Sequence, residues 1–177
     1  HNPGQRELPF CIHTRYSTQQ AILEDIVASL YLQGMRKLII LSGHGGNNFK
    51  GMIRDLAFVY PDFLIIAADW FSIVPPKGYF EAAVDDHAGE SETSVMMHYH
   101  PELVNLAEAG DGESKPFAIP SLNEKVGWAP RHWDNVTVDS GVGNPQKASA
   151  DKGERYMKPV VEKLAKLFTE VGQGSLY

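Results

Sequence analysis

The stretch Lys37–Phe71, KLIILSGHGGNNFKGMIRDLAFVYPDFLIIAADWF, decides the predicted fold. Its two continuous apolar runs, at 37–41 and 62–71, are typical of strands that are buried on both faces. Apolar residues at helical spacing lie between the two runs, and a similar pattern precedes the first run at 22–30. The order helix–strand–loop–helix–strand predicts an α/β fold with a parallel sheet that helices cover on both faces.

Local sequence signals mark where the first two helices begin and end. Ser17 and Gln20 form the pattern of a capping box at the start of the first helix, and Gly34 is the predicted end of that helix. Asn47 is well placed to cap the helix that follows the glycine-rich loop.

The second half of the chain has a less regular pattern. Pro101 interrupts a helical repeat. Residues 110–147 are rich in Gly, Pro, Asp and Asn but contain two tryptophans, so we interpret them as a long ordered loop and not as a linker. A last helix is predicted from Asn144 to about Gly172, with a kink at Pro159.

Composition limits the class of protein. The chain has 177 residues, of which 43% are hydrophobic, so it can form one domain with a sizeable core. A net charge of −6 without any basic run disfavours a nucleic-acid binder. Cys11 is the only cysteine, which excludes an intramolecular disulfide and fits a cytoplasmic location. No apolar run reaches the roughly 18 residues that a membrane span needs.

The loop SGHGGNN places one histidine, His44, just past the first predicted strand. Parallel sheets bind ligands at the carboxyl ends of their strands, and the neighbouring Gly45 and Gly46 leave room for a substrate to approach the ring. An imidazole here suits a metal ligand or a catalytic base. It suits a phosphate site less well, because no lysine follows as in a P-loop. A tight turn with an incidental histidine is the alternative.

The segment DDHAGESETS, residues 85–94, gathers acidic, imidazole and hydroxyl side chains at the start of a predicted helix. Carboxylates are ordinary there, because the helix dipole favours them. His87 is harder to explain, since the positive helix end disfavours a charged ring, and a neutral imidazole can bind a metal or carry a proton. Glu90 and Glu92 are two residues apart and would point to nearly opposite sides, so at most one is expected to contact a metal or substrate.

Three motifs, in this order, resemble the creatininase (creatinine amidohydrolase) family: SGHGGNN, HAGESETSVM and GVGNPQKASADKGERY. The opening HNPGQ is also similar to a family stretch that ends in Pro-Gly-Thr. In its GHGGN and HAGE elements the chain resembles a subgroup that includes formamide hydrolases and a peptidase of peptide-cofactor maturation. The likeness runs nearly from end to end.

The resemblance implies a three-layer α/β/α sandwich around a mostly parallel sheet, and a metal-dependent hydrolase of a small cyclic amide or formamide. By this resemblance, His44 would bind a divalent metal ion, His87 would pass a proton to the leaving nitrogen, and Glu92 would lie near the substrate. Zinc, manganese or iron is expected, with two ions per full-length subunit, in a homo-oligomer such as a hexamer. Gly45 and Gly46 are candidates for substrate contacts, and Trp128, like Trp70 and Trp133, is a candidate wall of the substrate pocket, with core packing as the alternative.

The chain departs from the family pattern at two places. Creatininase has a metal-binding glutamate at the position of Gly46, and Glu90 is a candidate to supply the missing oxygen. The family's Glu-x-His pair and bridging aspartate would precede every residue of this sequence, which begins without Met. We therefore expect residues 1–177 to be a single creatininase-like domain without that ligand-bearing segment, the C-terminal two thirds of a longer polypeptide.

Three other functions compete with a hydrolase of non-peptide amides. A non-catalytic binding or structural subunit would keep the fold without the metal centre. A creatininase-family peptidase would cleave a peptide, and a nucleotide-binding protein would hold a phosphate at residues 43–47. The histidines of both motifs favour the hydrolase, because a fold without chemistry needs neither.

Overall fold

The computed structural model describes residues 3–175, which form two compact units. The first unit comprises residues 12–74 and the chain from 160 onward, and the second comprises residues up to 11 and 75–159. In chain order the elements are η1 (Pro3–Gln5), α1 (Tyr16–Leu32), β1 (Lys37–Ser42), α2 (Lys50–Val59), β2 (Leu64–Asp69), η2 (Trp70–Ser72), α3 (Glu90–Tyr99), η3 (Pro101–Leu103), α4 (Pro120–Asn123), α5 (Trp133–Val136), η4 (Pro145–Lys147) and α6 (Ala150–Gln173).

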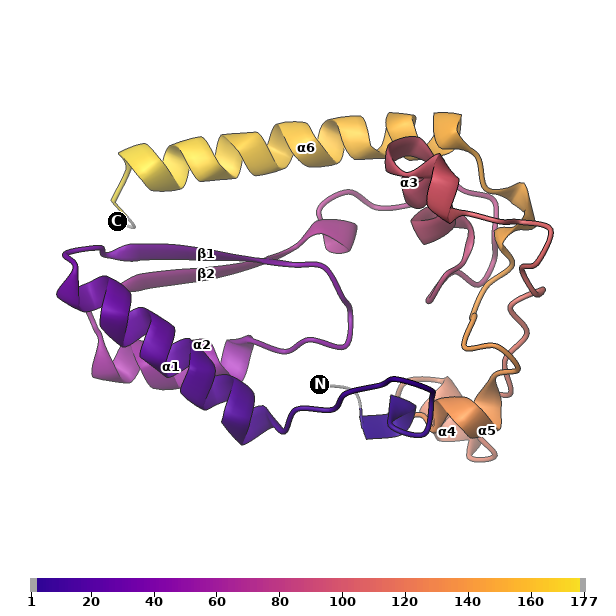
Figure 1. The fold of residues 1–177 in the computed structure, drawn as a ribbon, viewed down its shortest axis with the longest axis horizontal. Helices are drawn as coiled ribbons and strands as arrows, with labels where there is room; N and C mark the ends of the chain where they lie inside the picture. Colours follow the sequence, from indigo (N-terminus) through magenta and orange to yellow (C-terminus); the bar gives the residue numbers. More distant parts are fainter. Residues whose placement is uncertain (1–2, 176–177) are drawn as a thin grey trace. The chain divides into compact units, whose positions relative to one another are not determined.

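The first unit is built on the predicted parallel pair of strands. β1 and β2 run in register from Lys37 opposite Leu64 to Ser42 opposite Asp69, so both strands end at one edge. Helices α1 and α2 lie on one side of the strands, and the C-terminal part of α6 lies on the other (Figure 1). The parallel pairing is confirmed. The complete burial expected for the first strand is wrong, because Leu41 is exposed in the two-stranded sheet that residues 3–175 form.

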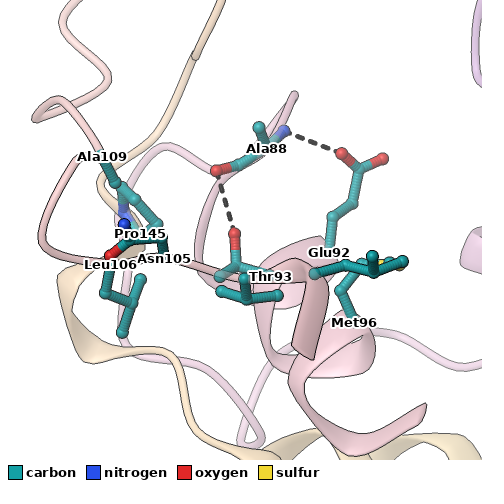
Figure 2. A pocket seen from close by; sticks show the side chains of 10 residues that line it. Ala88, Glu92, Thr93, Met96, Asn105, Leu106, Ala109 and Pro145 are labelled. Atoms are coloured by element: carbon teal, nitrogen blue, oxygen red, sulfur yellow. Dashed lines mark hydrogen bonds between the residues drawn. The ribbon is translucent and has the colours of Figure 1, made fainter. Parts of the chain in front are cut away.

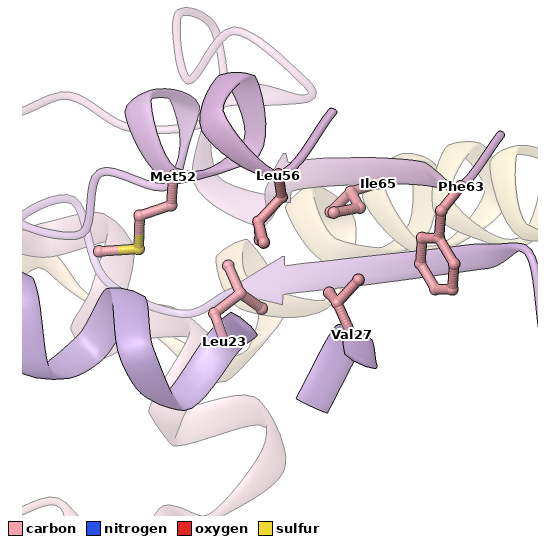
Figure 3. Close-up of a cluster of buried hydrophobic side chains, with 6 residues drawn as sticks. All are labelled: Leu23, Val27, Met52, Leu56, Phe63 and Ile65. Atoms are coloured by element: carbon pink, nitrogen blue, oxygen red, sulfur yellow. The ribbon is translucent and has the colours of Figure 1, made fainter. Parts of the chain in front are cut away.

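The core of this unit lies between the two helices and the sheet (Figure 3). Its fully buried members come from α1, α2 and the second strand with the residue before it: Leu23, Val27, Met52, Leu56, Phe63 and Ile65. The spacing of four residues within each helix places both members of a pair on one face, which is the periodicity that the sequence displays. Ile22 and Ile26 share the apolar pattern of α1 but lie half-exposed beside this face.

Helix α1 ends as predicted but begins differently. Gly34 has a φ of +86°, and its N–H and that of Met35 bond back to the carbonyls of Tyr31 and Leu30, the pattern of a Schellman cap. The predicted capping box at Ser17 is wrong. Arg15 occupies the N-cap position without a side-chain hydrogen bond, because the helix starts one residue before that serine.

The last helix begins later than predicted. Asn144 caps the short η4 turn, where its Oδ1 accepts the N–H of Gln146 at 2.9 Å, and extended backbone at Ala148 separates this turn from α6. The helix then continues through Pro159. At its far end the Lys37 ammonium donates to the carbonyls of Val171 and Gly174, at 2.6 Å each, which ties the end of the helix to the start of β1.

The second unit consists mostly of loops that short elements hold in place. An isolated antiparallel bridge joins His87 to Val142, and another joins Ser114 to Thr137. The ordered loop predicted at 110–147 is confirmed, with α4 and α5 as its regular parts. Gly153 lets the start of α6 approach α3 closely, because a Cβ there would collide with the backbone carbonyl of Ser94.

The two methionines Met52 and Met35 give a test of the core in the first unit. Met52 is 1% exposed and Met35 is 48% exposed. Met52→Ala should lower the free energy of unfolding by about 2–5 kcal/mol, because it leaves a cavity. Met35→Ala should change it by less than about 0.5 kcal/mol. Urea denaturation of both variants measures the difference, and equal losses would contradict the assignment of the core.

Candidate functional site

The glycine loop lies at the carboxyl edge of the parallel strands, as predicted. It begins directly after Ser42, the last residue of β1, whose hydroxyl donates to the carbonyl of His44 at 3.3 Å. The N–H of Asn47 donates to the same carbonyl at 3.1 Å and closes the turn. The His44 side chain is exposed at this edge. The sequence therefore located both the loop and its histidine correctly.

The predicted cap of α2 at Asn47 is wrong, because Phe49 occupies the N-cap position without a side-chain hydrogen bond. Asn47 does not cap the helix, and its amide points back to the Ser42 hydroxyl at 3.5 Å. The Oδ1 of Asn48 accepts the N–H of Lys50, the first residue of the helix, at 3.2 Å.

The His44 ring is held by the glycine that lies two residues after it. The N–H of Gly46 donates to His44 Nδ1 at 3.3 Å, so this nitrogen presents its lone pair to the backbone. Gly45 lies beside the ring of Phe71, where a Cβ would make ordinary contact at 3.8 Å. The loop thus fixes the imidazole through its Nδ1 side. A metal ion at that nitrogen would have to replace the Gly46 hydrogen bond.

The second motif holds its histidine more firmly, from both backbone and side chain. The N–H of His87 donates to the Val142 carbonyl at 3.0 Å, and the N–H of Val142 donates back to the His87 carbonyl at 2.8 Å. The ring meets Trp133 edge to face, with 5.1 Å between centroids. Backbone pairing and ring packing therefore restrict both the position and the orientation of the imidazole.

Glu92 completes the surroundings of this ring. Its Oε2 lies 3.8 Å from His87 Nδ1 and accepts the N–H of Ala88 at 2.8 Å. Ala88 has a φ of +51°, an uncommon conformation for a residue with a side chain, and this turns its N–H toward the carboxylate. The two side chains are about one third exposed, so both polar groups are accessible. The predicted catalytic residues His87 and Glu92 are thus neighbours.

Trp133 is itself held in place by its own neighbours. The Arg131 guanidinium lies 4.5 Å from the centre of the Trp133 ring and pairs with the Asp86 carboxylate at 2.6 Å. Gly4, in the HNPGQ motif, packs against the backbone of Arg131, where a Cβ would collide. The opening motif, the tryptophan loop, the HAGE segment and the closing GVG segment therefore meet around one histidine.

Asp85 fixes the turn that leads into α3. Both of its carboxylate oxygens face the N–H of Ser91, at 3.1 and 3.3 Å, and a Cβ on Gly89 would collide with this carboxylate. Burial raises the pKa of Asp85, against the opposing effect of the Ser91 hydrogen bonds, and the nearby charges of Glu90 and Glu92 raise it further. The glycine of HAGE is required here because the carboxylate occupies the space of a side chain.

Glu90 points away from Glu92, as the helical spacing predicts. Its carboxylate is fully buried, where Oε2 accepts the N–H groups of Glu81 and Ala82 at 2.8 and 2.7 Å and Oε1 accepts from the Lys152 ammonium at 2.5 Å. Lys152 also pairs with the exposed carboxylate of Glu81 at 2.9 Å. The Glu90 carboxylate thus joins the segment before the HAGE motif to α3 and α6.

These contacts shift the pKa values of the three charged groups. Burial would raise the pKa of Glu90, but Lys152 and the two backbone N–H groups outweigh it and hold the pKa below 4.5. Hydrogen bonds to Glu90 and Glu81 raise the pKa of Lys152 above 10.5. Hydrogen bonds from Lys147 and Lys152 lower the pKa of Glu81 to about 2. The network is therefore fully charged near neutral pH.

The donor set for a metal ion is incomplete among residues 3–175. No group of three or more His, Cys, Asp or Glu side chains lies close enough there to hold an ion. A catalytic zinc ion usually has about three protein ligands. His44 can serve as one ligand at most, and the Glu90 oxygens already face a lysine and two backbone donors.

A cavity of about 330 Å³ opens beside Glu92 in the second unit (Figure 2). Thr93 and Met96 of α3 line it together with residues 103–106. The Met96 side chain is 39% exposed and faces the cavity. Trp128 is absent from this lining and is 86% exposed, so the cavity gives no support to its predicted substrate contact.

The sequence did not predict the two contacts that hold His87. Nothing distinguished Trp133 from the other tryptophans as its neighbour, and Val142 contacts it through the backbone. Composition gives no signal for either contact, although the GVG motif in the closing segment marked the region. The family resemblance implies that His44 and His87 act in one site, and this stays a prediction, because the two residues belong to different units.

The fold and the site place the protein in the α/β class. It has a glycine loop at the carboxyl edge of two parallel strands and a separate histidine–carboxylate pair. Comparison with known families then identifies the family. The family model for creatininase, described as creatinine amidohydrolase, matches residues 1–168. The chain belongs to the creatininase family.

Curated relatives have different activities. The chain is 32% identical over 130 residues to a mycofactocin precursor peptide peptidase of Mycobacterium ulcerans (strain Agy99), covering 71% of the chain and 45% of that protein. It is 24% identical over 170 residues to the creatinine amidohydrolase of Pseudomonas putida, covering 87% and 63%. The chain thus spans about half the length of the curated relatives it matches.

Solved structures agree on the fold. A provisionally assigned creatinine amidohydrolase from Bacteroides fragilis NCTC 9343 is 83% identical, with a TM-score of 0.96 over the whole chain and 70% of that structure. A mutant creatininase complexed with creatine is 22% identical, with a TM-score of 0.73 over 94% of the chain and 69% of that structure. The predicted α/β, creatininase-like fold is confirmed.

The buried Glu90–Lys152 pair predicts a large and specific loss of stability. Lys152→Met should lower the free energy of unfolding by about 3 kcal/mol, because it leaves a buried carboxylate without its cation. Lys166→Met, on the same helix, removes an exposed pair with Glu170 and should cost less than about 1 kcal/mol. Urea denaturation at pH 7 measures both, and equal effects would contradict the role of the pair.

The Glu90–Lys152 pair also determines how the loss of stability in Lys152→Met depends on pH. The lowered pKa of Glu90 gives stability that is complete above pH 4.5 and disappears as the pH falls through the lowered value. The raised pKa of Lys152 gives stability that is complete below pH 10.5 and disappears at higher pH. The difference between wild type and Lys152→Met should therefore be constant between these limits and shrink in acid. A difference in the free energy of unfolding that grows in acid would contradict the stabilising role of the charged Glu90 carboxylate.

Proposed function

We propose that the protein hydrolyses the C–N bond of an amide, with His87 as the group that protonates the leaving nitrogen. Membership of the creatininase family supports this reaction class. The single observation that carries the role of His87 is its enclosure by the Val142 backbone, the Trp133 ring and the Glu92 carboxylate. A histidine whose backbone is paired and whose ring is packed against a tryptophan is held in one orientation, as a positioned proton donor must be.

The proposed step moves one proton at His87. A water oxygen forms a bond to the amide carbonyl carbon, the C–N bond breaks, and the nitrogen departs with a proton donated by the imidazolium. The carboxylic acid and the amine are the products. The ring regains its proton from the attacking water, so the balance of atoms closes. A positioned general acid contributes about 10²–10⁴-fold to such a step.

Glu92 is proposed as the residue that assists His87. Its Oε2 is 3.8 Å from His87 Nδ1, within the range of an ion pair and beyond that of a good hydrogen bond. The carboxylate therefore lies beside the ring that donates the proton in the proposed step. Glu90 is proposed as a structural anchor in place of the predicted metal ligand, since both of its carboxylate oxygens accept hydrogen bonds from protein donors.

We also propose that the protein requires a divalent metal ion, and His44 is the one ligand that we propose for it. The neighbours in known structures include a mutant creatininase of the Zn–Zn type. Among residues 3–175, no group of three or more His, Cys, Asp or Glu side chains could hold an ion, so His44 is the one ligand proposed here. No catalytic step is assigned to the ion. Zinc, manganese or iron, two ions per full-length subunit, and contacts of Gly45 and Gly46 with substrate stay predictions.

A peptide substrate is the second candidate. The similarity to a mycofactocin precursor peptide peptidase, at 32% identity, favours it over a small cyclic amide such as creatinine. The reaction at the C–N bond is the same for both substrates. Assays with formamides, cyclic amides and short peptides separate the two.

Assembly and location are proposed from the family resemblance. A homo-oligomer, with a hexamer as the first expectation, and a cytoplasmic location stay predictions. None of the helices in the described part of the chain is long and apolar enough to cross a membrane.

His87→Ala should slow amide hydrolysis by about 10²–10⁴-fold. His100→Ala removes an exposed histidine that pairs with Glu102 at 3.2 Å, and it should leave the rate unchanged. Initial rates on the best substrate of the amide screen, at pH 7, measure both. Equal rates for His87→Ala and wild type would remove His87 from the reaction.

His44→Ala should lower the bound transition metal by at least about tenfold, because the substitution removes a ligand. His87→Ala should retain the metal. Elemental analysis after dialysis with Mn(II), Zn(II) or Fe(II) measures the stoichiometry in both variants. Equal loss of metal in the two would contradict this division between a ligand and a proton donor.

A further inference from the structure

The cavity beside Glu92 is built almost entirely within one segment of the second unit. Glu92, Thr93 and Met96 line one side of it from α3, and Leu103 and Leu106 line it from η3 and the loop that follows (Figure 2). Its volume of about 330 Å³ lies at the lower end of the range for ligand pockets. It has room for a branched aliphatic or aromatic group.

Three polar groups in the lining already have partners in the protein. The Thr93 hydroxyl donates to the Ala88 carbonyl at 3.1 Å, and the Glu92 carboxylate accepts the Ala88 N–H at 2.8 Å. Asn105 accepts the N–H of Ala107 at 3.2 Å. With these groups engaged, the contacts left for a ligand come mainly from the side chains of Met96 and the leucines. Methionine adapts its shape to such a ligand.

The cavity adjoins the proposed proton donor through one residue. Glu92 lines the cavity and also lies 3.8 Å from His87 Nδ1. The cavity and the His87 ring therefore share Glu92 as a common neighbour.

We propose that this cavity is a specificity subsite that receives an apolar substituent on the leaving nitrogen of the substrate. The substrate class is then an N-alkyl or N-arylalkyl amide, including a peptide bond followed by an apolar residue. The inference rests on the proposed function, because the leaving nitrogen is defined by proton donation from His87.

Two formamides that differ only in the nitrogen substituent test the subsite. N-methylformamide and N-isobutylformamide release amines of similar basicity, so their intrinsic reactivities are matched. In the wild-type protein the isobutyl compound should have a kcat/KM at least about tenfold higher, since even one methylene in an apolar pocket changes this ratio by about tenfold. Equal values of kcat/KM would overturn the proposal.

Matched methionine variants locate the effect. Met96→Asp should abolish the preference, because it places a charge in the cavity, and Met96→Leu should keep it. Met35→Asp is the control, since this methionine has a similar exposure of 48%, compared with 39% for Met96, and lies in the first unit. A preference that survives equally in Met96→Asp and Met35→Asp would overturn the proposal.

A binding measurement separates this inference from the proposed function. Calorimetry with His87→Ala compares the Kd of the two formamides without turnover, and with Met96→Asp added. Tighter binding of the isobutyl compound that Met96→Asp removes, together with no hydrolysis by the wild type, would support the cavity and contradict the hydrolase. Hydrolysis without any difference in Kd would contradict the subsite and leave the hydrolase intact.

Discussion

The buried carboxylate of Glu90 is the constraint on which the rest of the second unit depends. It holds the backbone at residues 81 and 82 on one side and Lys152 on the other. A carboxylate can remain charged in such a place only if donors surround it, and here they are provided by segments far apart in the sequence. Because Glu90 is also the first residue of α3, the pair fixes the helix that carries Glu92 and the turn that carries His87.

Four sequence motifs that look unrelated in the linear chain act together around His87. The closing GVG segment pairs with its backbone, and the loop around Trp133 covers one edge of its ring. The opening PGQ turn supports that loop, because Gly4 packs on Arg131. Gly4 and Gly143 let backbone pack on backbone, and Gly89 leaves room for the Asp85 carboxylate. A mutation in any one motif is therefore expected to act on the same histidine.

The sequence predicted the parts of the fold that depend on local periodicity. Continuous apolar runs indicated both strands, and the spacing of Met52 and Leu56 indicated the buried face of α2. The opposite directions of Glu90 and Glu92 followed from helix geometry alone. Such patterns do not identify contacts between residues that are far apart in the sequence. Nothing near Glu90 signals Lys152, 62 positions away, and the φ of +51° at Ala88 depends on a hydrogen bond to Glu92 that only the folded chain provides.

The central claim is that His87 protonates the leaving nitrogen, and the dependence of the rate on the leaving group tests it most directly. Two amides with one acyl group should be compared, one with an alkylamine and one with p-nitroaniline, which needs little protonation to depart. The account predicts that His87→Ala loses far more activity on the alkylamide than on the anilide. Equal losses on both substrates would contradict it, because a residue that only binds or supports the site would affect the two alike.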